Sequence, residues 1–525
     1  DAWWEVTCLT AAFHTHIGVV SVMFDPLRNM EHRKLIRRLV DLADRLVFHN
    51  MGFDIPPLVA HRILTLDDVN KVWDTLVLAK MIRTSDRAGR SLEDLAVRYG
   101  IVPDDGISMA RVFTASGYGS VKDGFSNVDI SSGTYRDGAM SDTVVTLRLL
   151  PILEKAVVDR HDATTGAPGA VLSTDEAKDL VKRMQRVAQI CARRAARGFR
   201  FDPEFPELFR SRTQEDVRAT VQTLTGAGLE PGRGDKLVEK LSSMGQLPDG
   251  WPRTSTGKLS ADKKAMAKLV SVGHPLAEAH LVYAETTKVN NYLTKIIDQG
   301  RATGRIHPSI GVLAASASGR MAISNPELHQ FPGNARGIIL ADELPGWSSV
   351  DWSSIEPVVM SVCAGDNDFI TPFYQGQDLY IPVARTAGLI PPSVSDEDAA
   401  HHSGRKVSKV LLLAGMYGQG INSLSAGLQG ALKRVVPKDE ARSLSDSFRA
   451  AMPVTFAFMK NLEGIADGRG CVTTIAGRVL DEDRGYSYRA VNHFCQGSAA
   501  DVLYDATLRL DDAGLSDHIH LWMHD

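Results

Sequence analysis

Cysteine is scarce in this chain, and long hydrophobic runs are missing. The 525 residues include five cysteines, which lie far apart with no paired spacing: Cys8, Cys191, Cys363, Cys471 and Cys495. Disulfide frameworks and zinc sites need cysteines at short intervals, so we expect reduced thiols and neither kind of cross-link. No apolar stretch reaches the roughly 18 residues that cross a bilayer, and no basic-then-apolar leader precedes the first predicted strand. These absences predict a cytoplasmic protein with no membrane partner.

An excess of one charge is lacking too. Lys and Arg number 59 against 63 Asp and Glu, which gives a net charge of −4. This balance neither indicates nor excludes nucleic-acid binding, because binding depends on where the basic residues lie and not on the net charge. Locally basic runs lie at 183–186, 193–197 and 433–438. Each, taken alone, is typical of a solvated helix face.

The length and the composition indicate a multidomain globular protein. A chain of 525 residues is too long for one core, so we expect about three or four domains. Its 44% hydrophobic and 23% charged residues are ordinary for globular proteins. The sequence opens on Asp1 without a methionine and stops at Asp525 inside an apolar run. We therefore expect a fragment that is truncated at both ends.

Hydrophobic periodicity divides the chain into an α/β front and a mostly helical remainder. Up to about residue 160, short apolar runs alternate with amphipathic segments; the runs lie at 6–12, 18–24 and 45–48 and the segments at 33–44, 92–99 and 142–156. Residues 162–169 are rich in helix breakers and predict a domain boundary. Residues 173–299 read as helical and begin with a capping box, Ser173-Thr-Asp-Glu176. Further on, strands are predicted at 305–313, 346–351, 470–479 and 518–523, and helices through 355–465.

Two aspartates in strand-like runs flank a basic helix in the last third of the chain. Asp351 lies in Ser-Ser-Val-Asp-Trp-Ser-Ser-Ile-Glu, and Asp525 closes His-Ile-His-Leu-Trp-Met-His-Asp. Between them, four residues recur at every fourth position and share one helix stripe: Arg405, Lys409, Leu413 and Tyr417. Two carboxylates from distant strands can hold a pair of Mg²⁺ ions, and a cationic helix can hold a triphosphate. This combination predicts nucleotidyl transfer assisted by two metal ions.

The same segments resemble the motifs of family A (Pol I-like) DNA polymerases of bacteriophage type. Asp351-Trp-Ser-Ser-Ile-Glu356 resembles motif A, the Arg-x3-Lys-x7-Tyr-Gly helix resembles motif B, and His524-Asp525 resembles the start of motif C. Three further stretches agree in order and spacing: Ser318-Gly-Arg320 with the following Asn325-Pro, Asn492-His-Phe-Cys-Gln496-Gly-Ser-Ala-Ala-Asp501, and His49-Asn50-Met-Gly-Phe-Asp54. A bacteriophage enzyme would work in the cytoplasm of the host cell.

The resemblance implies an RNase H-like exonuclease domain followed by a right-hand polymerase, with α/β and α+β parts. The expected divisions are an exonuclease-like domain at 1–161, a helical thumb at 170–300, a split palm at 301–363 and 469–525, and helical fingers at 364–468. Because the palm is split in the sequence, its two aspartates lie far apart in the chain.

The resemblance also assigns roles around the incoming nucleotide. Asp351 and Asp525 would bind two Mg²⁺ ions, with Mn²⁺ as a substitute. Lys409 would face the α-phosphate and act as a general acid, and Arg405 would face the γ-phosphate. The Leu413 and Tyr417 end of the helix would face the base pair. An alternative from the residues alone is an amphipathic helix with an exposed Arg and Lys.

Two positions of motif A have simple structural alternatives. Glu356 would exclude a ribose 2′-hydroxyl by its bulk, or else be a solvated helix residue; its neighbours Ile355 and Pro357 favour the first role. Asp351 would otherwise cap a helix that begins near Ser353. Leu413 stands where the family usually has Phe or Tyr, which predicts altered sugar discrimination and speed without loss of activity.

The expected partners are primer–template DNA and dNTPs, bound by a monomer. Four residues resemble contacts to the terminal base pair: Arg320, Asn492, Gln496 and His524. Minor-groove acceptors lie in similar places in every Watson–Crick pair, so Arg and Gln can test pair shape without reading sequence. The Gln496-Gly-Ser-Ala-Ala segment is otherwise a close-packed helix start.

The front of the chain resembles a 3′–5′ exonuclease that has lost part of its site. Asp54 belongs to the second motif of that family, and Asp142 to the third. The Asp-x-Glu pair of the first motif is absent, and Gly138 stands where the family usually has Tyr, with Tyr135 three residues too early. We expect an exonuclease fold without its first motif, which proofreads in the full-length parent and is inactive in this fragment.

Two other functions stay open on the sequence alone. Phage-type single-subunit RNA polymerases share the palm, the basic helix and a His-Asp motif, whereas Glu356, the Gln496 segment and the exonuclease-like domain favour DNA synthesis. A non-catalytic protein that binds primer–template DNA is the second alternative. A stand-alone ribonuclease or exonuclease is weakened by the missing carboxylates.

Overall fold

The computed structural model describes most of the chain as two compact units. It describes residues 6–84, 89–101, 109–162, 172–254, 256–270, 272–315, 317–343, 346, 348–483 and 485–523. The first unit comprises Asp1–Arg197, Ile310–Ala322 and Ser349–Asp525, and the second comprises Gly198–Ser309 and Ile323–Ser348. The chain therefore crosses between the units several times, and each unit is described by itself. The predicted limits of the domains remain predictions.

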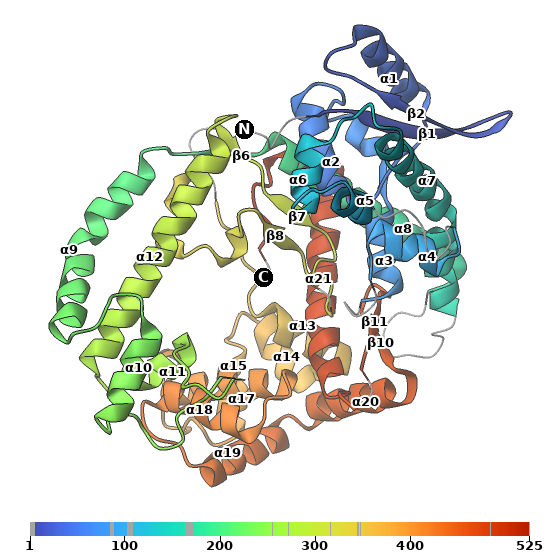
Figure 1. Cartoon of the computed structure of the whole chain (residues 1–525). Coiled ribbons are helices and arrows are strands. Elements are labelled where there is room, and N and C mark those ends of the chain that lie inside the picture. Colours follow the sequence, from blue (N-terminus) through green and yellow to red (C-terminus); the bar gives the residue numbers. More distant parts are fainter. Residues whose placement is uncertain are drawn as a thin grey trace. The chain divides into compact units, whose positions relative to one another are not determined.

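The front of the first unit contains a β-hairpin and a separate parallel strand pair (Figure 1). Strands β1 (Leu9–Thr15) and β2 (Gly18–Phe24) pair in antiparallel register, while β3 (Leu46–Phe48) and β4 (Val72–Asp74) pair in parallel. The helices of this region are α1 (Met30–Leu42), α2 (Met51–Ala60), α3 (Thr75–Ile82), α4 (Leu92–Arg98), α5 (Met109–Ala115), α6 (Val121–Asn127), α7 (Gly133–Asp162) and α8 (Thr174–Arg197), with a 3-10 turn, η2 (Asp68–Lys71). The predicted alternation of strands and helices is confirmed here. The predicted boundary at 162–169 lies almost entirely outside the described residues.

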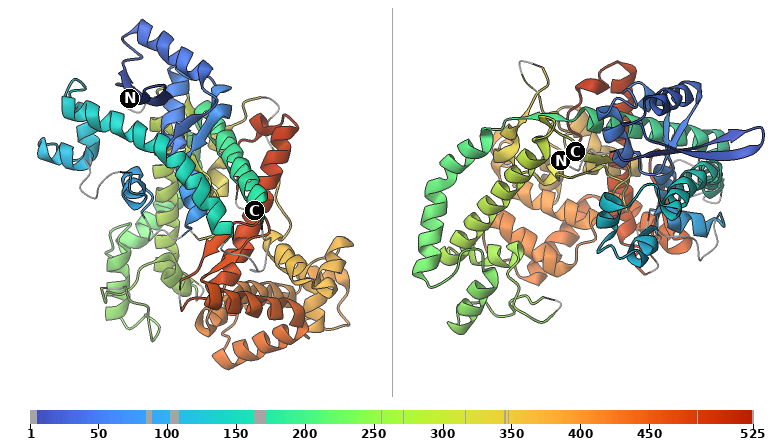
Figure 2. Two further views of the ribbon diagram at one scale, coloured as in Figure 1. Left: turned by 90° about the vertical axis from the view of Figure 1, so that its right-hand side faces the viewer. Right: turned by 45° about the horizontal axis from the view of Figure 1, so that its top comes forward.

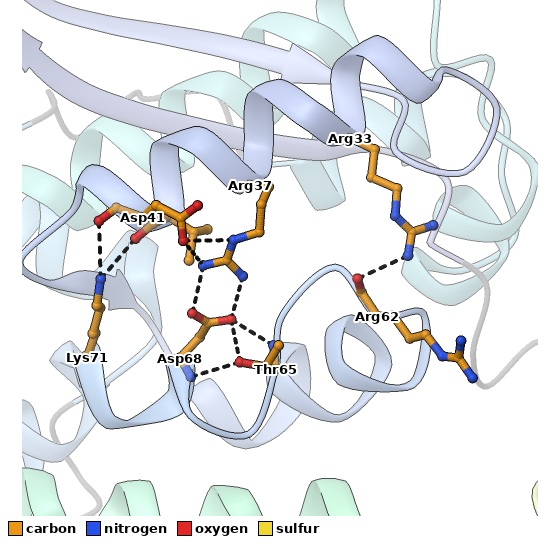
Figure 3. Close-up of polar contacts among 8 residues, drawn as sticks. Arg33, Arg37, Asp41, Arg62, Thr65, Asp68 and Lys71 are labelled. Carbon is orange, nitrogen blue, oxygen red and sulfur yellow. Dashed lines mark hydrogen bonds and ion pairs between the residues drawn. The ribbon is translucent and has the colours of Figure 1, made fainter.

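An ion-pair network joins α1 to the turn before β4 (Figure 3). Arg37 donates hydrogen bonds to both carboxylate oxygens of Asp68, at 2.7 and 2.8 Å, and also to Asp41. Asp68 accepts two more from the backbone N–H and the hydroxyl of Thr65. The guanidinium of Arg37 is the main cause that holds the pKa of Asp68 well below its usual range. Charge-assisted bidentate bonds of this kind fix the two elements in one orientation.

Helix α8 completes the free edge of the parallel strand pair. Its side chain Gln185 accepts from the backbone N–H of Asp74 at 2.8 Å and donates to the carbonyl of the same residue at 2.9 Å. Gln189 donates to the carbonyl of Val72 at 2.8 Å. Backbone groups at a strand edge need partners once they are buried, and two glutamines supply them here in place of a third strand. The helix begins with the predicted capping box, since Ser173 and Glu176 bond each other reciprocally.

The second unit is helical apart from one small sheet. Its helices are α9 (Phe205–Gly226), α10 (Gly234–Ser243), α11 (Lys263–Val270) and α12 (Pro275–Gly300), and its 3-10 turns are η3 (Leu328–Gln330) and η4 (Gly333–Ile338). Strands β6 (Arg305–Ile306), β5 (Phe199–Phe201) and β9 (Ile339–Leu340) form the antiparallel sheet in that order. The core at α9–α12 gathers Leu224, Leu237, Leu241, Trp251 and Met266. This confirms the predicted helical stretch from 173 to 299, apart from the short strand β5.

The rest of the first unit is also mainly helical. It contains α13 (Ile355–Ala364), α14 (Asn367–Tyr374), α15 (Tyr380–Thr386), α16 (Asp396–His401), α17 (Ser403–Met416), α18 (Ile421–Leu432), α19 (Lys438–Ala451), α20 (Pro453–Arg469) and α21 (Arg489–Asp512), with η5 (Ser516–His518). Strands β10 (Cys471–Thr473) and β11 (Val479–Asp481) form a hairpin. Two more short strands, β7 (Ser309–Gly311) and β8 (Ala322–Ser324), lie where the chain passes between units. A continuous core joins the helices through residues such as Met360, Leu411, Phe448, Leu462 and Phe494.

Two predicted strands are wrong. The described residues of 346–351 form no strand, and 518–523 begins in the 3-10 turn η5 and continues as irregular chain. Val350 is 90% exposed, so the first segment has neither a strand neighbour nor a packed face. An apolar run becomes a strand only where another strand pairs with it, and among the described residues none lies beside these two. The fold is therefore mostly helical with few short strands, and none of its described helices is long and apolar enough to cross a bilayer.

Candidate active site

Three segments that are far apart in the sequence meet at Glu356. This residue lies in the first turn of α13 and is 7% exposed. One carboxylate oxygen accepts from the guanidinium of Arg320, and the other accepts from the hydroxyl of Tyr417. The thiol of Cys495 on α21 donates to the backbone carbonyl of Glu356 at 3.2 Å. The alternative that Glu356 is a solvated helix residue is therefore wrong.

The predicted basic stripe lies on α17, where Arg405 is half-buried and Lys409 exposed, while Leu413 and Tyr417 pack against the core. Val407, Leu411 and Leu412 are buried on the other side of the helix. Along the stripe, Lys409 is exposed, and its ammonium lies 5.9 Å from the ring centroid of Tyr380. Since no carboxylate among the described residues pairs with Lys409, its charge is available to a ligand.

Arg405 has an acidic partner that sequence reasoning missed. Its guanidinium donates to Asp378 at 2.6 and 2.9 Å and lies 5.7 Å from the ring centroid of Tyr380. Burial alone would raise the pKa of Asp378, but the bonds from Arg405 and from the backbone of Tyr380 and Ile381 hold it below its usual value. Nothing in the spacing of the sequence marks residue 378 as this partner.

Helix α17 ends at Met416, and Tyr417 is its C-cap. Gly418 has φ +59°, and its N–H donates to the carbonyl of Gly415 at 3.2 Å. The N–H of Gln419 donates to Ala414 at 2.9 Å, which completes a Schellman motif. This stop fixes the Tyr417 side chain at the helix end, where its hydroxyl reaches Glu356.

Two predicted primer-end residues lie in the N-terminal third of α21. Asn492 and Gln496 are half-buried and one helical turn apart, so they share a face. The helix begins at Arg489, so the alternative that the Gln496 segment is a helix start is wrong. The close packing is real, because a Cβ on Gly497 would lie 2.8 Å from Leu480 and 2.9 Å from Thr474.

Polar atoms without partners occur in the same set of residues. The Nε of Arg320 and the Oδ1 of Asn492 are buried and have no hydrogen-bond partner among the described residues. Buried polar atoms in native proteins are almost always paired, so each such atom needs an explanation. His524, the fourth predicted contact, lies outside the described residues.

The predicted metal site is described only in part. Asp351 is exposed on an irregular segment, and no described residue donates a hydrogen bond to it. The N-cap of α13 is Ser354, so the alternative that Asp351 caps this helix is wrong. Asp525 lies outside the described residues. Within the described part of the chain, no group of three or more His, Cys, Asp or Glu residues is arranged to hold a metal ion.

Of the two exonuclease-like aspartates, Asp54 on α2 is half-buried, whereas Asp142 on α7 remains partly exposed. Burial, aided by the carboxylate of Asp74, raises the pKa of Asp54 to about 7. Burial, with Glu93 nearby, raises the pKa of Asp142 to about 6. Sequence reasoning missed Asp74, which accepts from the backbone of Asn50 and Met51 and caps α3; those three bonds mark it as a structural residue.

Tyr135 is buried in α7 near that site, with its hydroxyl 3.7 Å from the thiol of Cys8. Burial is the main cause that raises its pKa well above the usual value, followed by the contact with Cys8. It lies on the same helix as Asp142, seven residues earlier. The absent first motif cannot be tested, because residues 1–5 lie outside the described part of the chain.

The comparisons with known proteins agree on one family. The family model described as "DNA polymerase family A" matches residues 210–525. The DNA polymerase of Mycobacterium phage D29 is 24% identical over 518 residues, covering 95% of this chain and 80% of that protein. The DNA polymerase of Mycobacterium phage L5 is 26% identical over 507 residues, covering 93% of this chain and 78% of that protein.

A solved structure shares the fold. The POL domain of Pol1 from M. smegmatis, in complex with DNA primer-template and dNTP, superposes with a TM-score of 0.73 at 22% sequence identity. The match covers 99% of this chain and 85% of that one.

Proposed function

The chain belongs to DNA polymerase family A and is a DNA-directed DNA polymerase, and we propose that it adds dNMPs to a primer 3′-hydroxyl at the site formed by Glu356, α17 and α21. The observation that carries this assignment is the meeting at Glu356. Arg320 comes from the primer-end segment, Tyr417 from the basic helix and Glu356 from motif A, and the three side chains form one buried contact. Segments singled out separately in the sequence thus share one place in the fold.

The chain's own residues would bind and orient the nucleotide. Lys409, exposed and without a carboxylate partner among the described residues, would face the α-phosphate and supply a proton to the leaving group. Arg405 would face the γ-phosphate, for which it must share its guanidinium with Asp378. Glu356, held on both oxygens, would present its bulk to the sugar and exclude a 2′-hydroxyl. Leu413 and Tyr417 would lie toward the base pair.

Family A polymerases use divalent metal ions. We propose that two Mg²⁺ ions, or Mn²⁺ in their place, are held by Asp351 and Asp525. The donor chemistry fits. Asp351 has an exposed carboxylate with which no described residue forms a hydrogen bond or an ion pair, and carboxylate oxygens are the ligands that Mg²⁺ prefers. Glu356 does not fit as a ligand, since both its oxygens are engaged by protein groups. When bound, such ions would neutralise the phosphates and activate the attacking hydroxyl.

Primer–template DNA and dNTPs are the proposed partners of a monomer. The buried Nε of Arg320, which has no partner among the described residues, is suited to donate to a minor-groove acceptor of the primer end. Asn492 and Gln496 on one face of α21 would contact the same base pair, together with His524. The proposed location is the cytoplasm of a host cell.

The front of the chain is proposed to be an exonuclease-like domain of RNase H-like type that proofreads in the full-length protein and is inactive in the fragment given by this sequence. Asp54 and Asp142 both have raised pKa values, so each carries less negative charge near neutral pH than an ordinary aspartate. The described residues of this region contain no cluster that could hold a metal ion.

Primer extension by the full-length protein tests the proposal. We expect template-dependent addition of dNTPs with Mg²⁺, little addition of rNTPs, and loss of addition in Asp351→Ala. The matched control is Asp446→Ala, an exposed acid on α19, which should extend primers like the parent. Preferential rNTP addition would favour an RNA polymerase, and tight primer–template binding without extension would favour the DNA-binding alternative.

A further inference from the structure

The backbone before Arg320 is held by a tyrosine hydroxyl from α21. Tyr504 is 1% exposed, and its hydroxyl donates to the carbonyl of Gly319 at 2.6 Å. The same hydroxyl accepts from the backbone N–H of Leu313 at 3.1 Å. One buried oxygen thus ties together two points of the segment 313–319, immediately before the residue that pairs with Glu356.

A buried arginine holds the same backbone from a second direction. Arg478, between β10 and β11, donates to the carbonyl of Ser318 at 3.2 Å and to that of Gly497 at 2.6 Å. Its Nε pairs with Asp501 at 2.5 Å, and the two side chains are 4% and 2% exposed. Gly319 has φ +70°, and a Cβ there would collide with the Arg478 guanidinium. The glycine is therefore required both by its φ angle and by the close approach of Arg478.

The exonuclease-like front of the chain supplies the third support. Lys80 on α3 donates to the carbonyl of Val312 at 3.1 Å. Thr84 and Asp481 exchange two hydrogen bonds, at 2.9 and 2.8 Å, and Arg160 pairs with Asp481 at 2.7 Å. Asp481 ends β11, three residues after Arg478. The front region thus contacts both the segment before Arg320 and the hairpin that carries Arg478.

These contacts lead directly to the nucleotide site. The backbone at Ser318 and Gly319 fixes the position of the next residue, Arg320. The guanidinium of Arg320 donates a hydrogen bond to Glu356, which also accepts one from Tyr417. Arg478 and Tyr504 touch neither the sugar nor the phosphates in the proposed function. Displacements of about 1 Å at a reacting centre cost large factors in rate, so groups that fix such a backbone affect catalysis without contacting the substrate.

We propose that Tyr504, Arg478 and Lys80 are positioning residues for sugar discrimination. They fix the backbone that presents Arg320, so that Glu356 stays in place against an incoming ribose. Lys80 gives the exonuclease-like region a part in DNA synthesis that does not depend on nuclease activity. This inference rests on the proposed function of Glu356.

Tyr504→Phe tests the proposal by removing one oxygen and little else. The readout is single-nucleotide insertion by the full-length protein with a dNTP and with the matching rNTP, expressed as the ratio of the two kcat/KM values. We expect this ratio to fall about threefold to tenfold, because a loosened Glu356 tolerates the 2′-hydroxyl. The matched control is Tyr118→Phe, whose exposed hydroxyl donates to the carbonyl of Asn127 at 3.3 Å, and which should leave the ratio unchanged.

Lys80→Met supplies a second, independent variant that keeps the aliphatic stem and removes the amine. We expect a smaller fall in the same ratio. In the double variant Tyr504→Phe, Lys80→Met, the ratio should fall by less than the product of the two single fold-changes, because both residues act on one backbone segment. Equal falls in kcat/KM for both sugars in either single variant would overturn the proposal and leave the contacts a purely structural role. If Tyr504→Phe does not fold, the ratio for Lys80→Met decides. Failure of the parent to add dNTPs would contradict the proposed function instead.

Discussion

At the scale of single residues, Glu356 and Asp54 show two different surroundings of a carboxylate. Both carboxylate oxygens of the buried Glu356 accept hydrogen bonds, one from a guanidinium and one from a phenol, in place of water. Burying a charged carboxylate without such partners costs several kcal/mol of folding free energy. Removing Arg320 would therefore destabilise the folded protein by more than the Arg320–Glu356 pair contributes to its stability. Asp54 differs from Glu356, because no cation among the described residues pairs with it, and burial together with Asp74 raises its pKa to about 7.

The raised pKa of Asp54 predicts a pH-dependent stability. Burial and Asp74 raise its pKa from about 3.8 to about 7, so between these values the folded state holds a proton that the unfolded state has lost. Stability therefore falls as the pH rises from about 4 to about 7. Asp54→Asn cannot ionise, and we expect it to stabilise the protein at pH 8 by roughly 2–3 kcal/mol more than at pH 5. Thermal unfolding at both pH values, in EDTA, measures this.

The control for that measurement is Asp446→Asn on the exposed face of α19. It removes the same charge without touching a buried site. If both variants shift the unfolding temperature equally, or if Asp54→Asn shifts it equally at pH 5 and pH 8, Asp54 does not carry a proton in the folded protein.

At the scale of elements, periodicity located the helices far better than the strands. The stripe on α17 and the capping box of α8 were both predicted, because each depends on residues within about four positions of one another. The strands at 346–351 and 518–523 failed, because pairing depends on a neighbour that a local pattern does not contain. For the same reason, the sequence offered no sign that Gln185 and Gln189 complete the edge of β4.

Gly418→Ala tests the stop of α17. Gly418 has φ +59°, and a Cβ there would lie 2.8 Å from the ring of Tyr488. We expect a loss of about 1–2 kcal/mol in the free energy of unfolding, because both the left-handed conformation and the contact disfavour a side chain. Denaturant unfolding measures it.

Gly430→Ala is the matched control for Gly418→Ala. Gly430 lies inside α18 with open space where the methyl group of an alanine would lie, so the substitution should stabilise that helix by up to about 1 kcal/mol. Equal effects of the two substitutions, in sign and size, would mean that Gly418 is not required by its conformation.

At the scale of the whole chain, the basic runs of α8 turn out to be paired within the first unit. Arg183 pairs with Asp505, Arg186 with Asp511 and Asp512, Arg193 with Asp511, and Arg197 with Asp517. These acids belong to α21 and η5. The pairs therefore join helices that are far apart in the sequence but lie beside each other in the fold (Figure 2). The sequence shows the charges of both helices, but no local pattern relates residues 318 positions apart.

Arg193→Met separates the two roles that a basic helix can have in a DNA polymerase. Arg193 and Asp511 are each 14% exposed at the side chain, and they pair at 2.8 Å. Because the guanidinium is already engaged, we expect the substitution to lower the free energy of unfolding by about 1–3 kcal/mol. We expect the salt dependence of primer–template binding to stay unchanged, since a lost phosphate contact would lower its slope by about 1.

Two measurements decide between these roles: denaturant unfolding, and fluorescence anisotropy of labelled primer–template DNA from about 50 to 200 mM salt. Arg136→Met on α7 is the control, because it removes an exposed positive charge for which the described residues offer no ion pair. It should leave stability unchanged. A lower salt slope with unchanged stability in Arg193→Met would show that this arginine leaves Asp511 to bind a phosphate. The expected result, a less stable protein with the parent's salt slope, would assign the charges of α8 to joining the front of the chain to α21.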